Sequence, residues 1–282
     1  MTEKEKMNRT KEEQTKEEQT AQLLKYRYAH RGLHQKPEIP ENSMAAFQRA
    51  VEEGFGIELD IHLTADGRLA VIHDSSLKRT CGADRIIEDM TLEDAQQYFL
   101  EESRERIPEF AEVLRLVGGR VPLIVELKTG KTAEGRDTTD PLCAKAVSVL
   151  DDYTKACSGR TGSVPVLFCL ESFSPVAVRW LRDNRPDLIR GQLAANLNKE
   201  KKVLPWYQNF LLKNLIIDRS GRPDFVAYHF EDREEKALKR YDGPLFFWTI
   251  CNYADLREAE KMGAAGIFEQ FNPKAYEEKS GR

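Results

Sequence analysis

Several features that would assign this chain to a common class of protein are missing from its sequence. Only five of the 282 residues are cysteine, and no two of them form a Cys-x-x-Cys pair. This spacing argues against a disulfide framework and favours free thiols in a reducing compartment. No apolar run approaches the ~20 residues that span a bilayer, and the N-terminus lacks the apolar stretch of a signal peptide. The expected location is therefore the cytoplasm.

An excess of charge of one sign is also missing. The chain has 43 basic and 47 acidic residues, which gives a formal net charge of −4. A nucleic-acid partner usually meets a basic face, so this balance argues against one. The nucleotide loops G-x-G-x-x-G and G-x-x-x-x-G-K-[ST] are absent as well. A local positive pocket for a single phosphate group remains compatible with this composition.

The first 22 residues are almost wholly polar, and the pentad Thr-Lys-Glu-Glu-Gln at 10–14 recurs at 15–19. Such a segment has too few apolar side chains to bury a core, so residues 1–22 are expected to form a disordered arm. Residues 23–282 are expected to form one domain. Its core can be supplied by a 40% hydrophobic composition with 13 Phe, 9 Tyr and 3 Trp.

From Lys25 onward, short apolar runs alternate with amphipathic stretches, a pattern that favours a parallel sheet. About eight such units over ~250 residues predict a closed (β/α)8 TIM barrel, with an open doubly wound sheet as the alternative. The expected strands are 26–30, 56–62, 69–73, 121–127, 164–170, 188–194, 223–228, 244–250 and 265–268. The expected helices are 43–53, 91–100, 109–117, 139–152, 174–184, 232–240 and 254–262.

One connection breaks this alternation. A tight Asp66-Gly67 turn joins two strand-like runs, as in a β-hairpin. The hairpin would bring His73 over the mouth of the barrel, near Glu58 and Asp60. The stretch of about 62–108 is then a small insertion after the second barrel strand.

Carboxylates recur on one face of two expected strands. Side chains two positions apart share a face, so Glu58 and Asp60, and likewise Glu126 and Lys128, would point into the lumen. Burying unpaired carboxylates is costly, and a cation would compensate for them. All-oxygen ligands suit one hard divalent cation, Mg²⁺ or Ca²⁺. Pairing with Lys128 or Arg31 is the alternative, and it explains one carboxylate better than all three.

Two histidines, His30 and His73, each end an apolar strand, the position from which barrel enzymes project catalytic groups. One such histidine alone is more often a structural hydrogen-bonding group. Together, with a metal site between them, they are expected to act as a general base and a general acid. Asp74 is expected to bond the backbone rather than orient its neighbour, and His62 to lie at the rim or behind the ligands.

Positive and aromatic side chains complete the expected site. Arg31 offers a planar fork and Lys128 a point charge for a phosphate group. Asn42 and Ser43 stand where a helix begins, and either can cap it. Trp248 ends another strand at the same face, where core packing and stacking on a substrate alcohol fit the pattern equally well.

Taken in order, these motifs resemble those of the glycerophosphodiester phosphodiesterase family, from Tyr28 to about Pro273. The shared motifs are His30-Arg31-Gly32, Pro40-Glu41-Asn42-Ser43, Glu58-Leu59-Asp60, Thr64 to Gly67, His73-Asp74, Glu126-Leu127-Lys128, Ser172 to Pro175 and Trp248-Thr249. The chain departs from the usual pattern at Ala65, where Lys is common, at Ile250-Cys251-Asn252 and at Glu269.

The resemblance implies a TIM barrel that hydrolyses glycerophosphodiesters to glycerol 3-phosphate and an alcohol. The residues that it implies are Glu58, Asp60 and Glu126 as metal ligands, His30 and His73 as the acid–base pair, and Arg31 and Lys128 as phosphate contacts. The alcohol, the preferred ion, the acid and base assignments, the route of attack and the oligomeric state do not follow from the sequence.

Two alternatives to this function remain. A lysophospholipase D reaction on the same scaffold would need an apolar mouth, which Trp206-Tyr207 and Phe210-Leu211-Leu212 could supply. A barrel that binds a phosphorylated ligand without catalysis is the less favoured alternative, because every expected metal carboxylate and catalytic histidine is present.

Overall fold

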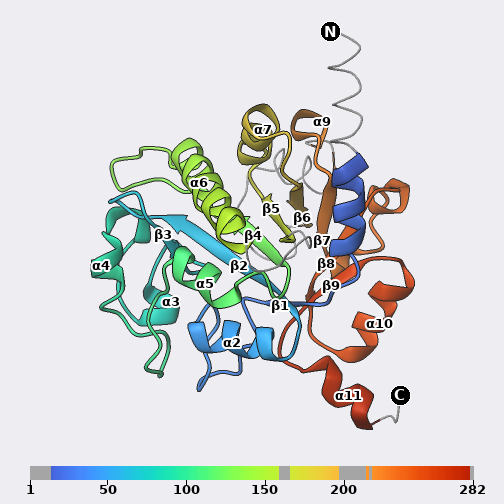
Figure 1. Cartoon of the computed structure of the whole chain (residues 1–282), viewed down its shortest axis with the longest axis horizontal. Coiled ribbons are helices and arrows are strands. Elements are labelled where there is room, and N and C mark those ends of the chain that lie inside the picture. Colours follow the sequence, from blue (N-terminus) through green and yellow to red (C-terminus); the bar gives the residue numbers. More distant parts are fainter. Residues whose placement is uncertain (1–13, 159–165, 197–213, 216–217, 280–282) are drawn as a thin grey trace.

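The computed structural model describes residues 14–158, 166–196, 214–215 and 218–279. In these ranges eight parallel strands close into a barrel, because β1 pairs with β2 on one side and with β9 on the other (Figure 1). The predicted (β/α)8 architecture is confirmed, and an open sheet is excluded. The barrel strands are β1 (Tyr28–His30), β2 (Gly56–Leu63), β4 (Leu123–Leu127), β5 (Phe168–Ser172), β6 (Arg190–Ala194), β7 (Phe225–His229), β8 (Leu245–Ile250) and β9 (Ala265–Phe268).

The period-two alternation of each strand builds two apolar layers. The outward side chains of β2, Ile57, Leu59 and Ile61, join the layer that lies under the helices. Inward side chains such as Tyr28, Phe225 and Phe246 fill the lumen. The outer layer therefore packs the helices against the sheet. The lumen layer lies beneath the side chains at the carboxyl end of the barrel and supports them.

Helices cover the outside of the barrel (Figure 1). Those that follow or precede barrel strands are α2 (Met44–Glu52), α5 (Phe110–Val117), α6 (Thr139–Ser158), α7 (Pro175–Asn184), α9 (Asp218–Gly221), α10 (Tyr253–Lys261) and α11 (Pro273–Lys279). Of the two expected caps of α2, Ser43 is the one that accepts a hydrogen bond, from the backbone N–H of Ala46. No helix in the described ranges is long and apolar enough to cross a membrane.

The prediction of a helix at 232–240 is wrong. Two short 3-10 turns, η2 (Phe230–Asp232) and η3 (Leu238–Arg240), lie there instead. The segment is highly charged, and only isolated side chains such as Phe230 and Leu238 reach the core. Too few apolar residues recur at helical spacing to hold a continuous helix against the barrel.

The hairpin and the insertion are both present. Strand β3 (Leu69–Val71) pairs antiparallel with β2, and it is followed by α3 (Lys78–Cys81), η1 (Ile87–Asp89) and α4 (Leu92–Ala95). The helix expected at 91–100 is thus confined to α4. The insertion buries an apolar cluster of its own, around Ile72, Leu92 and Leu100, so it packs as a firm lobe beside the barrel mouth.

Part of the expected N-terminal arm is helical. Residues 14–23 form a helix, and Leu23 is fully buried among the lumen side chains. Lys16 Nζ lies 2.7 Å from the carboxylate of Asp224, which precedes β7. The helix therefore packs at the amino-terminal end of the barrel, opposite the end where β1, β2 and β4 project their last side chains. Residues 1–13 lie outside the described ranges.

Candidate active site

Three carboxylates meet inside the carboxyl end of the barrel. Glu58 and Asp60 come from β2, and Glu126 comes from β4 in register with Asp60. All three are buried, and one ligand oxygen from each lies within 4.8 Å of the others. The period-two pattern of these strands thus brings together the residues that the sequence singled out.

Neighbouring donors hold the three carboxylates in place. The backbone N–H of Arg31 donates to Glu58 Oε2 at 3.0 Å, and Asn42 Nδ2 donates to Asp60 Oδ2 at 2.8 Å. Lys128 Nζ lies 3.0 Å from Glu126 Oε1 and 3.3 Å from Asp60 Oδ1. Asn42 therefore supports a carboxylate directly, beyond the capping role that its position suggested.

Three buried carboxylates crowd one another, with Lys128 beside two of them and Arg31 Nε 3.5 Å from Asp60 Oδ2. Burial, followed by the charges of Asp60 and Glu126, raises the pKa of Glu58 well above its usual value. Burial lowers the pKa of Lys128, but the two carboxylates beside it outweigh this effect and bring it to about 12. Asp60 Oδ1 faces Lys128 Nζ at 3.3 Å but makes no hydrogen bond within the described residues. Three buried carboxylates whose oxygens converge within 4.8 Å offer the hard donors that a divalent cation prefers.

His30 is held by a carboxylate from the far end of the sequence. Its Nδ1 lies 2.7 Å from Glu269 Oε2, and its Nε2 lies 3.8 Å from Glu58 Oε2. A carboxylate only accepts, so Nδ1 donates its proton and a neutral ring keeps a lone pair at Nε2. Burial and the charge of Arg31 lower the pKa of His30, although Glu269 opposes this effect.

His73 has a carboxylate partner as well. Its Nδ1 lies 2.6 Å from Asp74 Oδ1, and the guanidinium of Arg79 bonds the other oxygen of the same carboxylate. The expectation that Asp74 bonds the backbone is therefore wrong. A short side chain can reach back to the ring beside it here because Arg79 fixes its second oxygen.

The insertion supports His73 from behind. His62 is buried, with Nδ1 2.7 Å from Glu88 Oε1 and Nε2 3.1 Å from the carbonyl oxygen of His73. Glu88 also accepts a hydrogen bond from Ser75. His62 thus lies behind the carboxylates and ties the loop that carries His73 to the core of the insertion.

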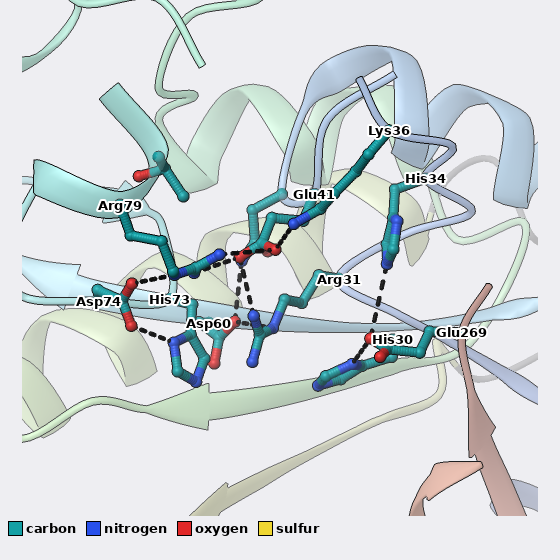
Figure 2. A network of polar contacts seen from close by, with 12 residues as sticks. His30, Arg31, His34, Lys36, Glu41, Asp60, His73, Asp74, Arg79 and Glu269 are labelled. Atoms are coloured by element: carbon teal, nitrogen blue, oxygen red, sulfur yellow. Dashed lines mark hydrogen bonds and ion pairs between the residues drawn. The ribbon is translucent and has the colours of Figure 1, made fainter. Parts of the chain in front are cut away.

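Glu41 connects the positive side chains around the mouth (Figure 2). It accepts from Arg31 at 2.8 Å and from Arg79 at 2.6 Å, and Lys36 also bonds it.

Arg31 and Gly32 both have positive φ, and a Cβ at position 32 would lie 2.9 Å from Ala46. Glycine is therefore required for the turn that directs the Arg31 backbone at Glu58.

A cavity of about 180 Å³ occupies the mouth above these residues. One half of its wall is polar and carries both histidines, Arg31 and Lys128, and the other half is apolar. Trp248 belongs to the apolar half: its Nε1 donates to Ala227 O at 3.2 Å and its ring meets Phe173 edge-on. The lining residues are His30, Arg31, Glu58, His73, Glu126, Lys128, Glu171, Phe173, Leu193, Trp248, Thr249 and Ile267.

A wider cleft of about 740 Å³ adjoins this cavity and shares His30, Arg31 and Thr249 with it. Its wall is mainly polar and includes Lys36 and Glu269. His34 lies there as well, with Nε2 3.7 Å from Glu269 (Figure 2). The site therefore has a small enclosed part and a larger, charged approach.

Glu171 is a cavity residue that the sequence reasoning missed. It lies on β5 in register with Glu126, is 1% exposed, and its Oε2 has no hydrogen-bond partner among the described residues. Burial, then the charges of Glu126 and Asp60, raises its pKa well above the usual value. A lone carboxylate in an otherwise apolar strand was the signal that could have revealed it.

Comparisons with known proteins agree with this geometry. Residues 30–271 match the model of the glycerophosphoryl diester phosphodiesterase family. A glycerophosphodiester phosphodiesterase of Caldanaerobacter subterraneus is 46% identical over 249 residues, covering 85% of this chain and 91% of its own length. A human lysophospholipase D is 22% identical over 281 residues, covering 87% of this chain and 83% of its own length.

Solved structures share the fold. An Oleispira antarctica phosphodiesterase, determined in complex with the product sn-glycerol-3-phosphate, superposes with a TM-score of 0.69. It is 20% identical to this chain, and the match covers 93% of this chain and 99% of the other. At that level of identity the likeness supports the architecture alone.

Proposed function

The chain belongs to the glycerophosphoryl diester phosphodiesterase family, and from this premise we propose that it hydrolyses glycerophosphodiesters to glycerol 3-phosphate and an alcohol. The observation that carries the proposal is a single cavity at the barrel mouth. Two carboxylate-bound histidines, an arginine, a lysine and a set of buried carboxylates line it together. That combination can bind a phosphodiester, exchange protons with it and hold a cation.

Glu58, Asp60 and Glu126 would hold one divalent cation, Mg²⁺ or Ca²⁺. When bound, such an ion supplies Lewis-acid polarisation of the phosphate and lowers the pKa of a nearby hydroxyl. Arg31 and Lys128 would bind the phosphate oxygens. Arg31 Nε lies 3.5 Å from Asp60 Oδ2 and makes no hydrogen bond within the described residues, so it could donate to a ligand oxygen there.

The two histidines would move the protons. His30, with its Nδ1 proton held by Glu269, would accept a proton at Nε2 from the attacking hydroxyl, either the glycerol 2-hydroxyl or water. His73 would donate a proton to the oxygen of the departing alcohol as the P–O bond breaks. If the glycerol 2-hydroxyl attacks, the alcohol leaves and a cyclic phosphate forms, which water would then open to give glycerol 3-phosphate. This first attack would exploit proximity that water lacks. Trp248 would pack against the carbon chain of the substrate.

Lysophospholipid cleavage is the second candidate, because one relative is a lysophospholipase D. The segments that could furnish an apolar mouth, 206–207 and 210–212, lie outside the described residues. Within the described ranges the cleft beside His30 is lined mainly by polar groups, with Leu33 and Phe271 as its apolar members. A polar approach favours a small hydrophilic alcohol over an acyl chain.

The direct test is a panel of substrates. Glycerophosphocholine, glycerophosphoethanolamine and lysophosphatidylcholine would be assayed with Mg²⁺, with Ca²⁺ and with chelator, and glycerol 3-phosphate or its acylated form would be measured. We expect turnover of the deacylated compounds with a divalent ion, and far poorer turnover of the lysolipid. A kcat/KM for the lysolipid equal to or above the others would reverse this ranking.

A further inference from the structure

Glu171 has no task in the mechanism above, yet it is among the most deeply buried polar side chains at the site. It is 1% exposed and lines the cavity, and its Oε2 has no hydrogen-bond partner in the described part of the chain. A buried polar atom without a partner is costly. A bound ligand that hydrogen-bonds the Glu171 carboxyl group would explain why this buried group is present.

The strand order defines where Glu171 lies in the ring of lining residues. Around the barrel, β2 and β4 supply the carboxylate cluster, β5 supplies Glu171, and β6, β8 and β9 supply Leu193, Trp248 and Ile267. Glu171 is in register with Glu126 on one neighbour and with Gly191 on the other. It therefore lies between the carboxylate cluster and the strands that supply Leu193, Trp248 and Ile267, where Thr249 is the polar lining residue.

Gly191, the neighbour of Glu171 on β6, leaves the space beside the Glu171 side chain free of another side chain. A Cβ there would lie 2.1 Å from the ring of Phe225, so no side chain can stand beside Glu171 at that level of β6. Glu171 is also not among the three residues whose ligand oxygens lie within 4.8 Å of one another. Neighbouring strands are ~4.8 Å apart, which is within the span of a three-carbon polyol.

We propose that Glu171 is a specificity-determining residue whose carboxyl group hydrogen-bonds the terminal hydroxyl of the substrate's glycerol moiety. The inference rests on the proposed function, since it assumes a glycerol phosphodiester in this cavity. The phosphate and 2-hydroxyl end of the glycerol would lie toward Glu126 and Lys128. The terminal hydroxyl would lie one strand further on, at Glu171, with the C–H groups against the apolar wall.

This placement has a consequence for the substrate class. In a 1-acyl lysophospholipid the terminal hydroxyl is esterified, so it has no proton to donate and carries a chain that the buried position cannot accommodate. A site built to bond a hydroxyl rejects an analogue that lacks it, because its own buried polar group is left unpaired. Glu171 would thus select deacylated glycerophosphodiesters.

The test compares glycerophosphocholine with the phosphocholine ester of propane-1,2-diol, which lacks only the terminal hydroxyl. We expect wild-type kcat/KM to favour the glycerol compound by roughly 10–100-fold, the range for one buried hydrogen bond to a charged or strongly polar group. Glu171→Met should abolish this preference and change turnover of the deoxy compound only a few-fold. Glu171→Gln, which keeps an acceptor oxygen, should retain part of the preference.

A matched control and a binding readout separate this role from others. Leu193→Met changes the same wall at nearly constant volume, and it should affect both substrates by the same factor. Calorimetric titration with glycerol 3-phosphate and with propane-1,2-diol phosphate should show the same loss of discrimination in Glu171→Met. This readout needs no turnover, so it decides the role of Glu171 even if the proposed hydrolysis fails.

Three results would overturn the proposal. The first is a wild-type protein that treats the glycerol and deoxy compounds alike in binding and turnover. The second is a loss in Glu171→Met and Glu171→Gln that is equal for both compounds, which would indicate a purely structural role. The third is weakened Mg²⁺ or Ca²⁺ binding in both variants with the preference intact, which would make Glu171 part of the ion site.

Discussion

Glu269 lies 2.7 Å from the Nδ1 of His30, although 239 positions separate the two residues along the chain. Closure of the barrel accounts for the contact, because β9 pairs with β1 and each residue immediately follows or ends its strand. The carboxylate fixes the ring orientation and the tautomer that leaves Nε2 available. Glu269 therefore lies directly behind a proposed catalytic group.

The first prediction concerns this pair. Glu269→Gln should lower kcat by roughly 10²–10⁴-fold with little change in KM, since a histidine without its carboxylate partner loses the correct tautomer and the stabilisation of its charged form. Steady-state kinetics with glycerophosphocholine would measure the effect. Glu258→Gln, which removes an exposed carboxylate from α10, is the control and should behave as wild type. A near-wild-type kcat in Glu269→Gln would show that catalysis does not depend on the Glu269–His30 contact.

The second prediction concerns phosphate recognition. Arg31→Lys should not restore function even though the charge is kept, because the compact ammonium cannot reproduce the spaced, planar donors with which the guanidinium bonds Glu41 and faces a phosphate. We expect kcat/KM to fall by about 10²-fold or more, in line with the loss of one charge-assisted hydrogen bond or two. Near-wild-type turnover would mean that Arg31 acts only as a point charge.

The third prediction concerns pH. The pKa of His30 is lowered by burial and by Arg31, and a general base must be unprotonated to act. Because its pKa is lowered, His30 stays unprotonated at lower pH than a free histidine. The midpoint of the acidic limb of the kcat/KM profile should therefore lie below about pH 6.5. An acidic limb that persists unchanged in His30→Ala would show that another group titrates there.

The fourth prediction assigns the two histidine roles. Each alanine variant should lose roughly 10²–10⁴-fold in kcat, and the losses should not multiply in the double variant. A p-nitrophenyl ester needs little protonation as its alcohol departs, so it should restore much of the rate in His73→Ala and little in His30→Ala. Rescue of His30→Ala alone would exchange the roles, and rescue of neither would end this assignment.

Local patterns in the sequence were sufficient to predict where most residues of the candidate site lie in the barrel. The alternation in β2 and β4 placed Glu58, Asp60 and Glu126 on the lumen face, and strand ends placed His30 and His73 at the mouth. These inferences depend on neighbours within a strand, where the two-residue period leaves one choice of face. The closed barrel then follows from the number of such strands.

Partners from distant segments could not be predicted in the same way. Glu269 meets His30 only after the barrel closes. The partner of Asp74 was not predictable either, since its carboxylate bonds both the neighbouring His73 ring and Arg79. Glu171 stood alone in an apolar run and gave no motif. The helix of residues 14–23 is polar along most of its length, and one apolar residue, Leu23, carries its contact with the lumen.

The central claim is that the three buried carboxylates hold a divalent ion that the reaction requires. The most direct measurement follows glycerol 3-phosphate release from glycerophosphocholine by metal-free protein to which Mg²⁺ or Ca²⁺ is added back. It is paired with calorimetric titration of each ion into wild type and Asp60→Asn. Asparagine keeps the volume and can still accept from Asn42, so the fold should survive while ion affinity falls by more than about 10-fold. We predict no activity without an ion and recovery with one. Full activity in verified metal-free protein, or an unchanged ion affinity in Asp60→Asn, would contradict the account.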